Sequence, residues 1–328
     1  MRLQFVISNQ TNPYWNIAVE NHLLSLHETE VVTLYLWKNR RTVVIGQNQN
    51  PFSECNVEAL EADGGFLMRR KTGGGAVYHD DGNINFSFVV PKALYDQTRQ
   101  FSVIQRAVLD FGIVAELSGR NDLLAIERDR SGATDASKEG RKFSGNAFSK
   151  GKYQDLHHGT ILIKGNMSDL ARYLKPKPAK LQKHGVASVR SRVVNLAELN
   201  PDITAESIVP RLRKAFVEEY CVECVDVSFD DIIRRDEVRR IHDHFASPEW
   251  KYGSWRTFTA QRTAQFDWGG VEVALTIDDN IIRDVQIASD ALDLAALDEA
   301  RRLLIGASVL QCPNSDNPIV CDIISLVY

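Results

Sequence analysis

The 328-residue sequence predicts an α+β protein with one large and one small domain. Short apolar runs that are typical of strands dominate the first half of the chain, and few helix-like segments lie between them. An α+β domain is therefore favoured over a doubly wound sheet, in which strands and helices alternate. A second series of strand-like and helix-like segments begins after residue 247. A chain of this length also exceeds the size at which one hydrophobic core usually stops growing.

The spacing of apolar residues places the elements of the large domain. Short runs that are apolar or alternating predict strands, whereas apolar residues three and four positions apart predict helices. Strands are expected at residues 3–7, 31–37, 42–45, 66–69, 76–78, 84–90, 123–126 and 160–163, and helices near residues 15–26 and 101–111.

A further helix is predicted over residues 204–220. Apolar residues recur there at helical spacing, and Thr204 and Ser207 are candidate caps for its first turn. Pro210 disfavours this helix, because a proline is accommodated best in the first turn.

The segment after residue 247 predicts a compact domain. Residues 271–277 and 281–287 are apolar runs joined by the polar turn Asp278-Asp279-Asn280, which is typical of a hairpin. A helix is expected near residues 292–305. We divide the chain into residues 1–246 and 247–328. The second part holds no glycine-rich basic loop and no lysine motif, so we expect it to be accessory.

Composition and charge limit the classes of function. The chain is 44% apolar and 25% charged, as in ordinary globular proteins, and its net charge of −4 disfavours a general nucleic-acid binder. Any phosphate binding must therefore depend on a local cluster of basic residues and not on the net charge of the protein. No apolar run approaches the roughly 18 residues that cross a bilayer, and the N-terminus does not resemble a signal peptide. We expect a cytoplasmic protein that binds neither nucleic acid nor membrane.

Five cysteines are too few for a disulfide framework, and their odd number fits a reducing compartment. Cys221 and Cys224 form a CxxC pair that follows a predicted helix end. A zinc site needs a second cysteine or histidine pair at suitable spacing, which the sequence lacks, so this pair is expected to be structural.

The segment from residue 69 to residue 79 is the most informative in the chain. Arg69, Arg70 and Lys71 precede Gly73-Gly74-Gly75, and a β-prone run follows. Glycines allow the backbone to approach a ligand closely, while guanidinium and ammonium groups favour phosphate or carboxylate. This combination predicts a local anion-binding loop.

Two other segments strengthen this interpretation. Lys142 lies among small residues and an aromatic residue in the segment 140–147, and His157-His158 precede the apolar run 161–163. With the glycine loop, they resemble the lipoate-protein ligase A family, within the biotin and lipoate ligase superfamily. Residues 15–20, 34–37, 43–51, 119–123 and 188–192 resemble the same family in the same order, so the resemblance covers most of the chain.

The resemblance implies a large mixed-sheet catalytic domain of the biotin/lipoate ligase type and a two-step reaction. Lipoate attacks the α-phosphate of ATP to give lipoyl-AMP and pyrophosphate, with Mg²⁺ bound mostly through phosphates. The lipoyl group then passes to a lysine of a lipoyl domain. The acceptors implied are the acyltransferase components of 2-oxoacid dehydrogenases and the glycine cleavage H protein.

The family's site residues carry over to matching positions of this chain. Lys142 is the catalytic candidate, because an ammonium can contact the carboxylate and the α-phosphate together. Arg70 offers a planar fork to either group. The residues implied in ATP and lipoate binding are Arg70, Gly74, Gly75, Ala76, Val77, Tyr78, Lys142, Trp37, His79, Asn83 and His158.

Several of these assignments keep an alternative. Trp37 is either a wall of the acyl site or an ordinary core residue, and each histidine taken alone is better explained by a structural role. Asp122 is a candidate Mg²⁺ contact, although this metal needs few protein ligands. Lys71-Thr72 stands where the family commonly has serines, so the extra lysine is expected to alter phosphate affinity.

Two other functions compete with the ligase. An octanoyl or lipoyl transferase shares the scaffold but uses a cysteine thioester, and no cysteine occurs between Cys55 and Cys221. A non-catalytic lipoyl-domain or small-molecule binder would not need Arg70 and Lys142. Biotin-protein ligase is disfavoured because its arginine-interleaved glycine loop is absent.

The lysine- and proline-containing segment 175–192 has no amphipathic period. It is either a solvated surface loop or a mobile loop that becomes ordered over the nucleotide.

Overall fold

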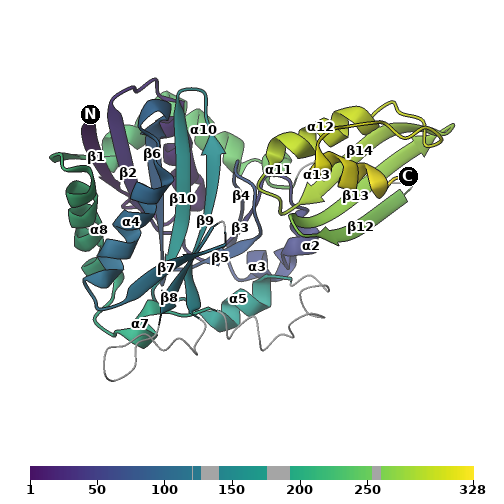
Figure 1. Ribbon diagram of the computed structural model, residues 1–328. Helices are drawn as coiled ribbons and strands as arrows, with labels where there is room; N and C mark the ends of the chain where they lie inside the picture. Colours follow the sequence, from purple (N-terminus) through teal and green to yellow (C-terminus); the bar gives the residue numbers. More distant parts are fainter. Residues whose placement is uncertain (120, 127–139, 176–192, 253–259) are drawn as a thin grey trace.

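The computed structural model describes residues 1–119, 121–126, 140–175, 193–252 and 260–328. In these residues the chain forms a large domain built around a mixed sheet and a small domain at the C-terminal end (Figure 1). The segment 176–192, which carries the loop hypothesis, lies outside the described residues. No helix in the described part of the chain is both long and apolar enough to span a membrane.

The central sheet has the strand order β11-β1-β2-β6-β10-β9-β8-β7 in the described ranges. Strand β1 pairs in parallel with both β2 and β11, whereas the other neighbours pair antiparallel. The predicted α+β class with a mixed sheet is confirmed. The strands are β1 (Arg2–Ile7), β2 (Val31–Trp37), β6 (Asn83–Pro91), β7 (Val114–Ser118), β8 (Asp122–Ile126), β9 (Arg141–Lys150), β10 (Gln154–Leu162) and β11 (Cys224–Val227).

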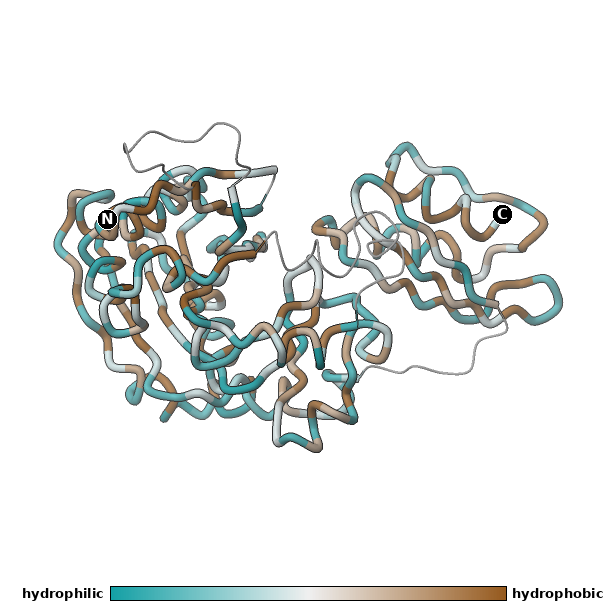
Figure 2. Tube along the Cα trace, turned by 90° about the horizontal axis from the view of Figure 1, so that it is seen from below, coloured by the Kyte–Doolittle hydropathy of each residue, from teal (hydrophilic) through white to brown (hydrophobic). Residues whose placement is uncertain are grey.

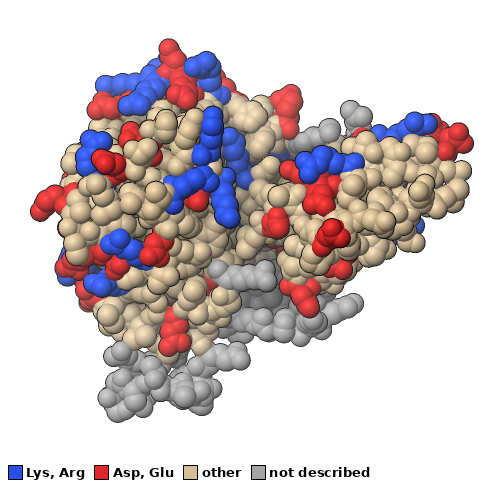
Figure 3. All heavy atoms as spheres, turned by 45° about the horizontal axis from the view of Figure 1, so that its top comes forward, with Lys and Arg blue, Asp and Glu red and all other residues tan. Residues whose placement is uncertain are grey.

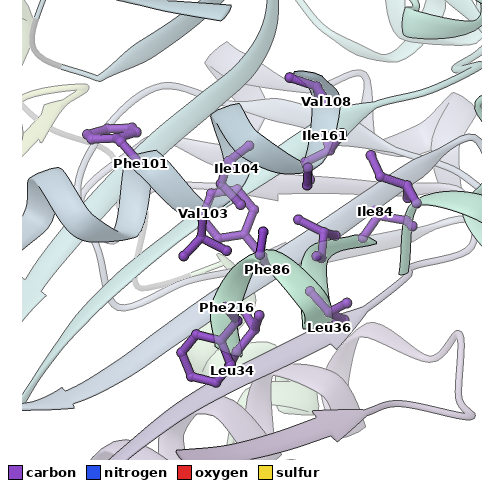
Figure 4. Packing of buried hydrophobic residues seen from close by; sticks show 14 of the residues in the cluster. Leu34, Leu36, Ile84, Phe86, Phe101, Val103, Ile104, Val108, Ile161 and Phe216 are labelled. Atoms are coloured by element: carbon purple, nitrogen blue, oxygen red, sulfur yellow. The ribbon is translucent and has the colours of Figure 1, made fainter. Parts of the chain in front are cut away.

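Helices cover both faces of this sheet because alternate strand residues point to opposite sides. On one face, Leu34 and Phe86 pack with Ile104 and Phe216 in a continuous apolar core (Figure 4). The helices of this face are α4 (Gln97–Leu109) and α8 (Ala205–Tyr220), and those packed on the other face are α1 (Pro13–Ser25), α9 (Phe229–Ile233) and α10 (Asp236–Ala246).

A second sheet of the large domain, with the order β4-β3-β5, lies beside the face that α1 covers. It carries the glycine loop between its strands β4 and β5. The strands are β3 (Thr42–Ile45), β4 (Phe66–Arg69) and β5 (Val77–His79). Short helices fill the connections of this domain: α2 (Pro51–Glu54), α3 (Val57–Ala62), η1 (Lys92–Leu94), α5 (Met167–Tyr173), α7 (Leu196–Leu199) and α11 (Pro248–Tyr252).

The small domain packs one face of the sheet β12-β13-β14 against two helices. The predicted hairpin is confirmed as β13–β14. Its turn residues Asp279 and Asn280 have φ values of 49° and 59°, as a type I′ turn requires. The elements are β12 (Ala260–Phe266), β13 (Gly269–Asp278), β14 (Ile281–Ser289), α12 (Leu294–Leu304) and α13 (Pro318–Ser325).

The predicted helix over 204–220 is present as α8. Thr204 caps it and forms a reciprocal capping box with Ser207. Pro210 lies inside this helix rather than in its first turn, and the helix continues past it to Tyr220. Interactions of the apolar face, with Ile208 and Leu212 fully buried, offset the lost amide hydrogen bond.

Several elements are absent from the sequence-based prediction: the strands β7, β9, β11 and β12, the helices α10 and α13, and the short helices α2, α3, η1, α5, α7, α9 and α11. Strand β9 carries mostly polar and small residues, so its sequence lacks an apolar strand pattern. The predicted strand at 160–163 is the end of β10, which begins at Gln154 and includes both histidines. Pairing with β6 and β9 on its two sides makes this polar segment a central strand.

The two domains lie side by side (Figure 2), and α11 lies between them (Figure 1). This helix follows the expected boundary at residue 246, yet it is held by Arg69 of β4. The Arg69 Nε donates to the Trp250 carbonyl oxygen at 2.9 Å, and the Trp250 Nε1 donates to the Arg69 carbonyl oxygen at 2.8 Å. The division at 246/247 stays a prediction, and these bonds attach the start of the second part firmly to the large domain.

Candidate active site

A cavity of about 1190 Å³ lies where the two domains meet. Its walls come from β2, β5, β9 and β10, from the glycine loop, and from residues 267–269 and 290–293 of the small domain. The molecular surface is hollowed between the two domains, and basic and acidic side chains are mixed over both of them (Figure 3).

Strand register gathers polar residues on the cavity side of the central sheet. Trp37 of β2 lies opposite Asn85 of β6, and Ser87 of β6 lies opposite His158 of β10. Each of these residues is buried. Because side chains alternate along a strand, all four point away from the apolar core that contains Phe86. A row of hydrogen-bonding groups thus lies beneath helix α1.

The basic cluster at residues 69–71 does not act as one unit. Only Arg70 lines the cavity. Arg69 is buried and donates to the carbonyl oxygens of Gln47, Gln49, Trp250 and others, which makes it an anchor of the neighbouring loops. The Lys71 ammonium lies 5.5 Å from the centre of the Phe245 ring, outside the cavity wall. This position does not support the expected effect of the extra lysine on phosphate affinity.

Arg70 shapes the glycine loop. Its Nη2 donates to the carbonyl oxygens of Gly73 at 2.7 Å and Gly75 at 2.9 Å, and its Nε donates to Thr72 Oγ1 at 2.9 Å. Its Nη1 makes a longer bond, of 3.4 Å, to the Val44 carbonyl oxygen. The guanidinium has five N–H donors, and the bonds above use four of them. The fifth donor, on Nη1, has no partner among the described contacts. Burial lowers the pKa of Arg70 to about 10, and Glu20 opposes that shift.

Lys142 projects from β9 into the cavity and pairs with Asp122 of β8, with 2.7 Å between Nζ and Oδ1. A bulge in the β8–β9 pairing, where Leu123 and Leu124 lie opposite Ser144 and Lys142, sets its direction. Gly145 leaves room for the ammonium, because a Cβ atom there would lie 3.0 Å from Lys142 Nζ.

His79 presents a hydrogen-bond donor to the cavity. Asn16 Nδ2 donates to Asn39 Oδ1 at 3.0 Å, so Asn39 Nδ2 is the donor in its 3.2 Å contact with His79 Nδ1. The proton of the neutral ring therefore lies on Nε2, which is buried and has no partner in the structure. Burial, reinforced by the charge of Arg70, lowers the pKa of His79 to about 3. The ring is neutral at ordinary pH.

Most of the predicted site residues meet at this cavity. Those that line it are Trp37, Arg70, Gly74, Gly75, Ala76, Val77, His79, Lys142, His158 and the metal candidate Asp122. Tyr78 and Asn83 do not. Tyr78 points to the opposite side of β5, where it packs against Tyr173, and Asn83 donates to Asn85 Oδ1 at 3.0 Å. Asn83 therefore supports a residue of the wall without being part of it.

Sequence reasoning missed two groups of wall residues. Asn85, Asn146 and Thr160 come from strands whose polar faces gave no pattern of their own. The accessory domain contributes Asp267, Trp268, Asp290, Ala291, Leu292 and Asp293. No sequence signal separates these residues from ordinary turn residues, since only the packing of the small domain brings them to the cavity.

None of the five cysteines, all of which lie in described ranges, lines the cavity. Cys55 is fully buried in the cluster around β3 and Tyr173, and burial raises the pKa of its thiol to about 12. Cys221 and Cys224 are free thiols near the start of β11. Among the residues described, no group of three or more His, Cys, Asp or Glu side chains could hold a metal ion.

Comparisons with known proteins agree with this architecture. Residues 12–217 match the lipoyl protein ligase A/B catalytic domain, and residues 256–311 match the bacterial lipoate protein ligase C-terminus. The lipoate-protein ligase A of Psychrobacter cryohalolentis is 38% identical over 307 residues, which are 91% of this chain and 86% of that protein.

Solved structures show the same fold. The LipL1 protein of P. falciparum, determined in complex with lipoate, superposes with a TM-score of 0.81 at 29% identity and covers 98% of both chains. A lipoate-protein ligase A bound with ATP has a TM-score of 0.62 at 23% identity, over 77% of this chain and 98% of that one. The catalytic and C-terminal domain matches, together with the similarity along nearly the whole chain, show that this protein is an enzyme of the lipoate-protein ligase A family.

Proposed function

We propose that the protein is an ATP-dependent lipoate-protein ligase that forms lipoyl-AMP and then lipoylates a lysine of a lipoyl domain. The observation that carries this proposal is the arrangement of Arg70, Lys142 and the glycine loop around one cavity with an apolar wall. The lipoate-bound relative from P. falciparum supports lipoate as the acid. The ATP-bound ligase with the same fold is consistent with ATP as the second substrate.

The first step brings two anions together. A lipoate carboxylate oxygen attacks the α-phosphorus of ATP, and the bond from that phosphorus to the bridging oxygen breaks, so pyrophosphate leaves. Lys142 is the residue that suits this step, because its ammonium can contact both anions. Asp122 holds the ammonium at 2.7 Å in the structure, so we propose that the incoming anions replace Asp122 as its partners. Arg70 then serves mainly to hold the glycine loop, whose amides we propose bind the phosphates once they are free.

The acyl chain of lipoate is proposed to lie along Ile17, Trp37, Val44 and Met68, the apolar part of the cavity wall. Trp37 is 5% exposed and belongs to both the wall and the core, so the two alternatives for this residue are compatible. The Nε2–H of His79 is a buried donor without a partner, and leaving such a group unpaired is costly. A ligand atom that accepts this hydrogen bond would remove that cost.

Mg²⁺ is part of the proposal as the partner of ATP. Asp122 is the carboxylate at the cavity wall beside Lys142, and it suits a metal that is held mainly by phosphates and water. The metal would neutralise phosphate charge.

In the second step, the neutral amine of an acceptor lysine attacks the acyl carbonyl of lipoyl-AMP. The amide bond forms, AMP leaves and the amine loses a proton. We propose lipoyl domains of 2-oxoacid dehydrogenase complexes and the glycine cleavage H protein as acceptors. A bi-partite lipoate protein ligase from Thermoplasma acidophilum, which has the same fold with a TM-score of 0.67, was studied with its E2 lipoyl domain. Five free cysteines are compatible with the cytoplasm as the location of this reaction.

The transferase alternative needs a cysteine nucleophile at the acyl site. Cys55 is buried away from the cavity, and its raised pKa makes it a poor nucleophile. A non-catalytic binder would not need the Lys142 ammonium in the cavity. Both alternatives are therefore weaker than the ligase.

The test is to incubate the purified protein with lipoate, Mg-ATP and a panel of lipoyl domains and to weigh the products. The expected result is a domain heavier by one lipoyl group, together with AMP and pyrophosphate, only when ATP is present. Transfer without ATP from an acylated protein donor would favour the transferase. Absence of lipoate-dependent ATP-pyrophosphate exchange would favour a non-catalytic binder.

A further inference from the structure

A chain of hydrogen bonds connects Arg70 to Trp37, which both line the cavity. From Arg70 Nε the contacts run to Thr72 Oγ1 at 2.9 Å, and from there to His158 Nε2 at 2.9 Å. His158 Nδ1 lies 2.8 Å from Glu20 Oε2. Ser87 Oγ donates to the same oxygen at 2.5 Å and accepts from Trp37 Nε1 at 3.0 Å. We call these six residues, Arg70, Thr72, His158, Glu20, Ser87 and Trp37, the Glu20 network.

The directions of these bonds follow from the donors and acceptors when Glu20 is ionised and the His158 ring is neutral. Trp37 Nε1 and Arg70 Nε are donors only, and an ionised carboxylate is an acceptor only. His158 Nδ1 must therefore carry the hydrogen that faces Glu20. The Nε2 of the neutral ring is then an acceptor, so the hydroxyl of Thr72 donates to it and accepts from Arg70. The carboxylate of Glu20 thus determines the tautomer of His158 and, through it, the orientation of the Thr72 hydroxyl.

The order carboxylate, imidazole, hydroxyl is that of a hydrolytic triad, but nucleophilic attack by Thr72 does not fit this site. Thr72 is 1% exposed and does not line the cavity. Its oxygen already accepts a hydrogen bond from Arg70. The network therefore fits a role in holding other groups in place.

Charge provides an independent reason for the presence of Glu20. The carboxylate and the guanidinium of Arg70 are both buried, at 1% and 6% exposure. A buried charge without a countercharge is expensive. Glu20 is the acidic group that opposes the lowering of the Arg70 pKa by burial. Its charge therefore favours the ionised guanidinium that holds the glycine loop.

We propose that Glu20, which does not touch the cavity, is a positioning residue for adenylation that fixes His158 and, through Thr72, the guanidinium of Arg70. This inference rests on the proposed ligase function. It also gives Ser87 and Trp37 a second role, since Ser87 donates to the oxygen of Glu20 that lies against His158 and itself accepts from Trp37.

The kinetic test measures lipoate-dependent ATP-pyrophosphate exchange in single and double variants. Glu20→Gln should lower kcat for exchange roughly tenfold or more, because hydrogen bonds to charged groups are among the stronger ones in proteins. Thr72→Val should have a similar effect, and Thr72→Ser, which keeps the hydroxyl, should restore most of the rate. The matched control is Asp155→Asn on β10, whose carboxylate pairs with Lys92 outside the network and should leave exchange unchanged.

The double variants separate positioning from general stabilisation. If Glu20 acts through Arg70, Glu20→Gln should lower exchange by less than about twofold in an Arg70→Lys background, since lysine lacks the Nε–H that bonds to Thr72. The proposal would be overturned if the rate losses of Glu20→Gln and Arg70→Lys multiplied in the double variant. It would also be overturned if folded Glu20→Gln exchanged at the wild-type rate. Circular dichroism and thermal unfolding of each variant identify any that fail to fold.

A second measurement does not depend on activity. In ring-labelled protein, NMR should show His158 in the tautomer with the hydrogen on Nδ1, with the signal assigned by its loss in His158→Gln. The opposite tautomer in the wild type would overturn the network. A wild-type protein without lipoate-dependent exchange would contradict the proposed function and the kinetic part of this inference, while the tautomer would still decide whether Glu20 orients His158.

Discussion

The backbone amide of Gly74 donates a hydrogen bond of 3.2 Å to the carbonyl oxygen of Ala291, so the glycine loop of the large domain is tied directly to the small domain. Nearby, the side chain of Leu292 lies within 4 Å of the place where a Cβ atom on Gly74 would be. In this arrangement the Gly74 amide, which is suited to bind an anion, donates its hydrogen bond to the Ala291 carbonyl oxygen instead. For that amide to reach a phosphate, the small domain has to release it.

Replacement of Gly73 by alanine should push the two domains apart. A Cβ atom at this position would lie 2.2 Å from the Ala291 carbonyl oxygen, which is far inside contact distance, and the obstacle is backbone. Small-angle X-ray scattering should show a larger radius of gyration for the variant than for the parent. Gly75→Ala is the control, since nothing lies within 4 Å of a Cβ there. Identical scattering from all three proteins would mean that the domain contact is absent in solution.

Lys142→Ala should keep the fold and lose adenylation. The side chain is 38% exposed, so its removal leaves no cavity in the core. Removal of one preorganised group that stabilises the transition state typically costs about 10²–10³ in rate, and a charged bridging group should cost at least that. Pyrophosphate exchange is the measurement, with the exposed Lys152→Ala as the control. A folded Lys142→Ala protein with near-normal exchange would remove this residue from the mechanism.

Gly145→Ala should displace the ammonium of Lys142 without unfolding the protein. The added Cβ would lie 3.0 Å from Nζ and 3.1 Å from Cε, and a flexible lysine end yields more easily than backbone. We expect exchange to fall on the order of tenfold, since small misplacements of a reacting group are costly. The thermal midpoint should change little. An unchanged rate would show that the ammonium tolerates the shift.

Stability should depend on pH through His79. The unfolded residue binds a proton below about pH 6.5, whereas burial lowers the pKa of the folded residue to about 3. Between these values the unfolded state holds more protons, so the contribution of neutral His79 is complete above pH 6.5 and is lost as pH falls toward 3. Urea unfolding from pH 7 to pH 4.5 should show a shallower loss for His79→Gln than for the parent. The exposed His27→Gln serves as the control, and equal slopes in all three proteins would contradict the buried neutral ring.

All five cysteines should be dispensable for the chemistry. A variant with alanine at Cys55, Cys221, Cys224, Cys312 and Cys321 should still lipoylate its acceptor, because none of these thiols lines the cavity. We expect a stability loss of about 1 kcal/mol or more from Cys55→Ala, which leaves a gap in a buried cluster. A thioester trapped on Cys55, or loss of transfer in folded Cys55→Ala, would favour the transferase instead.

The sequence by itself determined the α+β class, the hairpin with Asp279-Asn280 at its turn and the capped helix that begins after Thr204. These are local features, in which the period of apolar residues and the chemistry of turns and caps act within a few positions of the chain. It also indicated Arg70 and Lys142, because glycines and isolated cations in small-residue surroundings leave a local signal.

Tertiary structure alone decided what these residues contact. Whether Arg70 bonds its own loop, and whether Lys71 faces Phe245, depends on strands and helices that are distant in sequence. Strand β9 had no apolar pattern, so only its pairing with β8 and β10 made it a strand and aimed Lys142 at Asp122. The role of Glu20 is also invisible in the sequence, because its partners His158 and Ser87 come from strands 138 and 67 residues away and meet it only when helix α1 covers the sheet.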